Sequence, residues 1–70
     1  MAVVRVLELV GESTRGWEEA ASNAIAEASK TVDKVVGAEI VNWTANVNDG
    51  RITEYKANVK VAYLGGGDGA

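Results

Sequence analysis

EIVNWTANVNDGRITEYKANVKVAYL, residues 39–64, is the stretch that decides the fold. Two runs rich in β-branched and aromatic residues, 38–47 and 51–64, flank Asn48, Asp49 and Gly50. Asn, Asp and Gly tolerate the left-handed backbone that tight hairpin turns require, and β-branched and aromatic residues favour strands. The stretch therefore predicts two antiparallel strands joined by a short turn.

Two registers are open to this hairpin. A two-residue turn at Asp49 and Gly50 would set Trp43 opposite Lys56 and mix an apolar strand face with a polar one. A three-residue loop with Gly50 left-handed aligns the apolar faces instead. We predict the three-residue loop, whose pairs are Val47 with Arg51, Trp43 with Tyr55, and Val41 with Ala57.

The predicted register gives the sheet one apolar face and one mixed face. The apolar face, suited to receive a helix, carries Val41, Trp43, Ala45, Tyr55, Ala57, Val59, Val61 and Tyr63. The mixed face carries polar side chains together with a second apolar group. A single helix covers one face only, so this second group needs cover from neighbouring subunits. We predict these oligomer contacts at Ile40, Ile52, Ala62 and Leu64.

The residues before the hairpin predict one strand and one helix. The segment 2–10 is rich in Val and Leu and suits a strand, and Gly11 breaks the run. Ser13 or Thr14 can cap a helix that runs over 15–35, with Gly37 marking its exit. Apolar residues recur at helical spacing and define the face that packs on the sheet: Trp17, Ala20, Ala21, Ala24, Ile25, Ala28 and Val32.

Size and composition restrict how such a chain is stabilised. It has 70 residues and contains neither Cys nor His, which excludes disulfides, thiol or imidazole catalysis and the usual zinc sites. A domain this short buries a small core, so association is the stabilising device that remains. We expect one domain over 1–64 and a flexible, glycine-rich tail over 65–70.

Charge and hydropathy restrict the partners. The net charge is −3, the pI is about 4.7, and the seven basic residues are scattered, so we expect no nucleic acid partner. The apolar runs are far shorter than the roughly 20 residues that span a bilayer. We therefore expect no membrane partner and a cytoplasmic location.

Few residues carry a chemical motif. Trp17 and Trp43 could stack on a flat cofactor, but their place on apolar faces favours packing, as it does for Tyr55 and Tyr63. Lys56 projects from the mixed face, where a solvated lysine or an ion pair between subunits is the simpler interpretation. The glycine run 65–67 lacks the context of a phosphate loop. The acidic pairs, Asp49 with Glu54 and Glu18 with Glu19, form a cation site only if symmetry repeats them.

The order strand, helix, strand, strand resembles the dodecin family over residues 4–64. The matching pieces are VRVLELVGEST at 4–14, WEEAASNAIAEASKTV at 17–32 and the hairpin stretch quoted above. The resemblance implies an α+β fold of β-α-β-β order, with a three-stranded antiparallel sheet packed on one helix. It also implies assembly into a hollow homododecamer, with helices outward and small ligands held where subunits meet.

The resemblance also implies where a ligand would bind. In flavin-binding dodecins a tryptophan after the helix stacks on the ring system and a glutamine in the last strand bonds to its edge; these positions are Gly37 and Lys56 here. Glycine cannot stack, and lysine donates hydrogen bonds but cannot accept them. The favoured function is therefore storage of a small ligand or cation, of a non-flavin or calcium type, with metal ligands unidentified.

Two other functions stay open. One is a flavin (riboflavin or FMN) storage dodecin with an altered pocket, so calcium and weakly bound flavin are the candidate cofactors. The other is a small enzyme that uses Glu, Lys or Tyr at a subunit interface. Catalysis needs a positioned acid or base, and the sequence shows no paired constellation of that kind. We predict that the chain is not an enzyme.

Overall fold

The structure is a computed structural model, and it describes residues 3–64. Four elements follow one another: β1 (Arg5–Ser13), α1 (Trp17–Thr31), β2 (Val35–Asn48) and β3 (Arg51–Tyr63). The predicted order of strand, helix, strand, strand is confirmed. The predicted tail at 65–70 and the predicted strand start at residue 2 lie outside the described residues.

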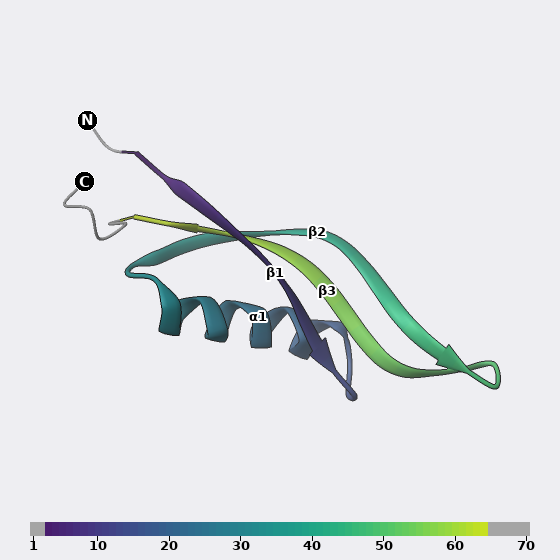
Figure 1. The fold of residues 1–70 in the computed structure, drawn as a ribbon. Coiled ribbons are helices and arrows are strands. Elements are labelled where there is room, and N and C mark those ends of the chain that lie inside the picture. Colours follow the sequence, from purple (N-terminus) through teal and green to yellow (C-terminus); the bar gives the residue numbers. More distant parts are fainter. Residues whose placement is uncertain (1–2, 65–70) are drawn as a thin grey trace.

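The three strands form one antiparallel sheet in the order β1-β3-β2, and α1 lies against one face of it (Figure 1). The helix packs mainly on β1 and β3. The predicted α+β architecture is therefore confirmed. Over residues 3–64, no helix is long and apolar enough to cross a membrane.

The core consists of small side chains, as the alanine-rich helical stripe predicts. Buried residues of α1 meet buried residues of β3, and Leu7, Leu9 and Ile25 pack around them. Gly11 lies within β1 rather than ending it, and a Cβ atom there would overlap the carbonyl oxygen of Ala20. The missing side chain lets the helix backbone approach the sheet. The fully enclosed set is Ala20, Ala21, Ala24, Ala28, Ala57, Val59 and Val61.

The predicted hairpin register is wrong. Asn48 pairs with Arg51 across a two-residue turn, in which Asp49 and Gly50 both have positive φ, 55° and 72°. Positive φ at both central residues is the type I′ turn, whose twist matches that of the strands. The apolar faces still align because the pairing shifts between Asn46 and Val47. The observed pairs are Val47 with Ile52, Ala45 with Tyr55, and Trp43 with Ala57.

Two shifts in register also move Ile40 and Ile52 from the face predicted for them. Between Ile40 and Asn42 the extra residue is Val41, so Ile40 pairs with Val59 and packs against the core under α1. Val41, predicted to face the helix, is exposed. Near the turn the extra residue is in β3, and Ile52 therefore pairs with Val47. The side chain of Val47 points to the opposite face from that of its neighbour Asn46. Ile52 thus lies on the helix side of the sheet, beyond the end of the helix.

The helix is shorter than the predicted 15–35. It begins after Gly16, which has no side chain to cap it. The Ser13 hydroxyl accepts a hydrogen bond of 2.9 Å from the Arg15 backbone N–H. It ends at Thr31 because Val32 is extended and Lys34 has a φ of 53°. The β-branched residues that follow start β2, so Gly37 lies inside that strand and is not the helix exit.

Candidate functional site

Gly37 and Lys56, the two ligand positions that the sequence predicts, lie far apart in one protomer. Gly37 pairs with Ala62 of β3, whereas Lys56 lies six residues earlier on the same strand. At the usual rise of about 3.4 Å per residue, this separates them by roughly 20 Å along the sheet. A single chain therefore cannot bring both to one small ligand, and a site that uses them requires more than one copy.

Lys56 is paired with Glu12 of the neighbouring strand. Its Nζ lies 3.8 Å from Glu12 Oε2, and the two residues are cross-strand partners of β3 and β1. On the other side Lys56 is the partner of Thr44 in β2. Residues directly opposite each other point to the same face, so Glu12, Lys56 and Thr44 form one row across the whole sheet. We call this set the polar row.

Side chains of helix α1 hydrogen-bond to the backbone at both ends of the polar row. The Asn23 amide donates a hydrogen bond of 2.8 Å to the Glu12 carbonyl on one edge strand. The Trp17 indole N–H donates a hydrogen bond, also of 2.8 Å, to the Thr44 carbonyl on the other. These two bonds join the helix to the backbones of both edge strands of the sheet. They fix the row from the helix side while its own side chains face away from α1.

Two aromatic side chains lie against the ring of Trp17. The ring of Trp17 meets Tyr55 edge-on, with centroids 4.8 Å apart, and meets Trp43 at 6.4 Å. The packing role predicted for Trp17 and Tyr55 is confirmed, since both are partly buried. Trp43 departs from that prediction: it is 49% exposed, because it lies on β2, the strand that α1 covers least. Its outer surface is therefore available to another molecule.

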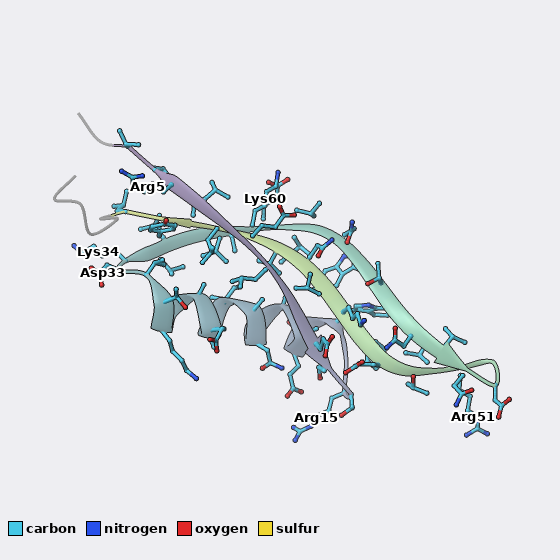
Figure 2. The ribbon with its side chains drawn as sticks, viewed as in Figure 1. Arg5, Arg15, Asp33, Lys34, Arg51 and Lys60 are labelled. Atoms are coloured by element: carbon cyan, nitrogen blue, oxygen red, sulfur yellow. The ribbon has the colours of Figure 1, made fainter. Side chains whose placement is uncertain are left out.

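The face of the sheet that α1 leaves uncovered carries three further cross-strand rows: two begin with a valine of β1, and the row between them is charged throughout. Beyond the polar row come Val10 with Asn58 and Asn42, then Glu8 with Lys60 and Glu39, then Val6 with Ala62 and Gly37. We call this surface the open face. Lys60 points from it, away from α1 (Figure 2).

The other charged groups labelled in Figure 2 lie at separate ends of the molecule. Arg51 lies at the hairpin turn and Arg15 at the start of the helix, with Asp33 and Lys34 near its end, and Arg5 lies at the start of β1. They gather into no basic patch of the kind that binds nucleic acid. Among residues 3–64 no three of the Asp, Glu, His or Cys side chains come close enough to hold a metal ion.

Comparison with known proteins identifies the family. The family model described as Dodecin matches residues 3–64. The chain belongs to the dodecin family. A curated relative, the "Calcium dodecin" of Mycobacterium tuberculosis, is 31% identical over 64 residues, which cover 90% of this chain and 89% of that protein. The sequence resemblance to dodecins is thereby confirmed.

Solved dodecin structures share the fold at similar identity. The dodecin from Streptomyces davaonensis superposes with a TM-score of 0.84 at 32% identity and covers 90% of this chain and 93% of its own. The dodecin from Streptomyces coelicolor gives 0.85 at 28% identity and covers 90% of each chain. The tt0972 protein from Thermus thermophilus gives 0.86 at 28%, covering 91% and 94%. Family membership supports a role in holding a small ligand and leaves its identity open.

Sequence reasoning missed two members of the polar row in this dodecin chain. Lys56 stood out because of its place in the family pattern, but Glu12 and Thr44 carry no motif. Their proximity depends on the pairing of β1 with β3 and on the bulge that shifts β2. A correct register would have revealed the row, and the sequence argued for a different register.

Proposed function

We propose that this chain assembles into a hollow homododecamer that binds and stores a small ligand or cation without chemical turnover. A non-flavin or calcium type of dodecin is favoured. The observation that carries the proposal is the amount of apolar side chain that one protomer leaves in water. Large apolar side chains left in water are a sign of an interaction surface, and sister chains are the simplest cover.

The exposed apolar side chains gather in two places. On the open face Val6 and Val10 are 59% and 56% exposed. The second place is the end of the hairpin: β1 stops pairing at Tyr55, so residues 51–54 have only β2 beside them. An isolated two-stranded ribbon is marginally stable in water. Val47 and Ile52 are exposed on that ribbon, and Trp43 is exposed further along β2, so this end of the molecule needs contact with another copy.

The two predicted ligand positions argue against flavin binding in the mode known for the family. Gly37 offers no aromatic surface, and stacking on such a surface contributes about 1–3 kcal/mol per ring. Lys56 has no acceptor of its own for a ring N–H. Both losses would act on the same ligand, so a non-flavin ligand is the better fit.

A calcium type is supported by the M. tuberculosis relative and by the carboxylates of the open face. Glu8 and Glu39 flank Lys60 in one row, and Glu12 lies in another. One chain gathers no cation site over the described residues. Symmetry can repeat one carboxylate per copy around an axis, and Ca²⁺ takes six to eight oxygen ligands.

One experiment tests the assembly and separates the ligand classes. Native mass spectrometry of the purified protein is expected to give twelve chain masses, with flavin and metal contents measured in the same sample. Colourless protein that gains thermal stability on addition of Ca²⁺ would support the calcium type, because a ligand that binds only the folded state stabilises it. Copurified yellow flavin would favour the alternative function. A single chain mass would refute the proposal.

Restoring the two family residues is expected to create flavin binding. Gly37→Trp with Lys56→Gln should bind FMN about tenfold more tightly than the unmodified protein. Stacking contributes about 1–3 kcal/mol per ring, and a tenfold change in affinity corresponds to about 1.4 kcal/mol. No heavy atom lies within 4 Å of a Cβ built at Gly37, so the protomer has room. FMN fluorescence quenching measures the affinity.

The matched control replaces the aromatic ring with apolar bulk, as Gly37→Leu with Lys56→Gln. Weak FMN binding by this control and tight binding by the tryptophan variant would assign the gain to stacking. Equal affinity in the unmodified protein and the tryptophan variant would show that Gly37 and Lys56 are not the ligand positions.

A further inference from the structure

The hairpin turn places Asp49 and Gly50 at the end of the molecule, beyond the helix (Figure 1). Both residues are exposed. Within residues 3–64 the Asp49 carboxylate has no hydrogen bond or ion pair. The bond that closes a two-residue turn joins its flanking residues, here Asn48 and Arg51, so the Gly50 N–H takes no part in it. An unengaged carboxyl group is therefore followed directly by an unengaged backbone nitrogen.

These two groups can react with each other. An aspartyl side chain forms a five-membered succinimide ring when the backbone nitrogen of the next residue attacks its Cγ atom. A side chain on that next residue hinders the attack, and glycine has none. A Cβ atom built at Gly50 would meet nothing within 4 Å, so the surroundings add no obstruction. Asp33, the other exposed aspartate of the described residues, precedes Lys34 and lacks this advantage.

The ring can close only when the turn opens. A type I′ turn fixes both dihedral angles of Asp49, whereas a planar ring requires the Gly50 nitrogen to rotate towards the Asp49 Cβ. Residues 51–54 have only β2 beside them, and two-stranded ribbons of this kind are marginally stable in water. The turn of a separate protomer can therefore open locally, while contact with another copy would keep it closed.

We propose that Asp49 is a site of spontaneous isoaspartate formation and that this rearrangement marks chains that have left the assembly. The bond from the Gly50 nitrogen to Cγ forms and a Cγ–O bond breaks. The oxygen leaves as water with the amide proton and one proton from the acid or the solvent. Water then cleaves the ring between its nitrogen and the Asp49 carbonyl carbon, so the main chain runs through Cγ. The reaction needs no oxidant or reductant, and the product has the mass of the parent chain.

The rearranged turn would not support the hairpin. Isoaspartate adds a methylene group to the main chain, and the register of a hairpin depends on turn type and loop length. The pairs nearest the turn, Asn48 with Arg51 and Val47 with Ile52, would be lost. Ile52 is one of the exposed apolar side chains that need contact with another copy. This inference therefore rests on the proposed function, because a rearranged chain is expected to stay outside the assembly.

The test ages the purified protein in neutral buffer made with H₂¹⁸O, because ring opening adds one ¹⁸O atom. Trypsin separates the two Asp-Gly pairs of the chain: Asp49 lies in peptide 35–51 and Asp68 in peptide 61–70. Mass spectrometry is expected to find the label at Asp49, with an isomer of altered retention, and several-fold less at Asp33. After size-exclusion chromatography, species of one or a few chains should contain several-fold more of the isomer than the full assembly.

Gly50→Lys is the matched control, because it makes the pair identical to Asp33 and Lys34. Lysine already adopts a positive φ of 53° at position 34 of this chain, close to the 72° of Gly50. The new side chain hinders the attack on Asp49. We expect the label at Asp49 to fall to the level found at Asp33, and the native mass of this variant to stay constant during ageing.

The outcomes separate this inference from the proposed function. Label at Asp49 that does not exceed that at Asp33 in the unmodified protein overturns the inference and leaves the assembly standing. Equal isomer content in the full assembly and in the smaller species also overturns it, because the rearrangement would then mark no separate population. A native mass of one chain in fresh protein refutes the proposed function, and the inference falls with it.

Discussion

Replacing Gly11 with alanine is expected to destabilise the protein by about 3 kcal/mol or more, at the upper end of the range for overpacked cores. The added Cβ would overlap the carbonyl oxygen of Ala20 and lie 3.0 Å from the Ala24 Cβ. The Ala20 oxygen belongs to the helix backbone, so no rotamer change can relieve the contact. A single-domain protein has a total stability of about 5–15 kcal/mol, so this loss is a large part of it. Urea unfolding, followed by circular dichroism, measures the effect.

Gly37→Ala is the matched control for this substitution. Gly37 is also a strand glycine, but a Cβ atom built on it meets nothing within 4 Å. Its unfolding midpoint should stay near that of the unmodified protein or rise slightly, because alanine has fewer unfolded conformations to lose. Both variants need the same protomer concentration, since association shifts apparent stability. A Gly11→Ala protein as stable as Gly37→Ala would contradict the close approach of α1 to β1.

The order of elements and the packing face of the helix could be read from the sequence because each depends on local pattern. Alanines at helical spacing predicted the buried stripe, and Ala20, Ala24 and Ala28 are all enclosed. Gly11 shows the limit of that reading. As a local signal it predicted the end of a strand, whereas its place inside β1 depends on the helix that packs above it. A tertiary contact decided the role of that residue.

The hairpin register could not be read because several bulges act together. Asn48, Asp49 and Gly50 suit both a two-residue and a three-residue turn, and a regular ladder favours the latter. In the structure a type I′ turn is followed by a shift near Val47 and another at Val41. Each shift moves the side chains that follow it in one strand to the opposite face relative to its partner strand. The faces predicted for Ile40 and Ile52 were wrong for this reason, and the polar row was missed.

The corrected position of Ile52 leads to the second large expected effect, on assembly. Ile52→Asp should convert the dodecamer into species of one or a few chains. The residue is 43% exposed in the protomer and lies on the part of the hairpin that neither β1 nor α1 supports. A surface substitution of this kind changes protomer stability by about 0.5 kcal/mol or less. An unpaired carboxylate buried between subunits is far more costly, at about 3–5 kcal/mol per uncompensated charge.

Ser22→Asp is the control for added charge, because Ser22 is exposed on α1 and the helix buries a different stripe. Native mass spectrometry and far-ultraviolet circular dichroism would be measured on both variants. We expect the control to keep the full mass and Ile52→Asp to lose it while retaining helix and strand signals. Retention of twelve chains by Ile52→Asp would show that the hairpin end stays in water within the assembly. The apolar side chains of the open face, Val6 and Val10, would then have to provide the contacts between copies.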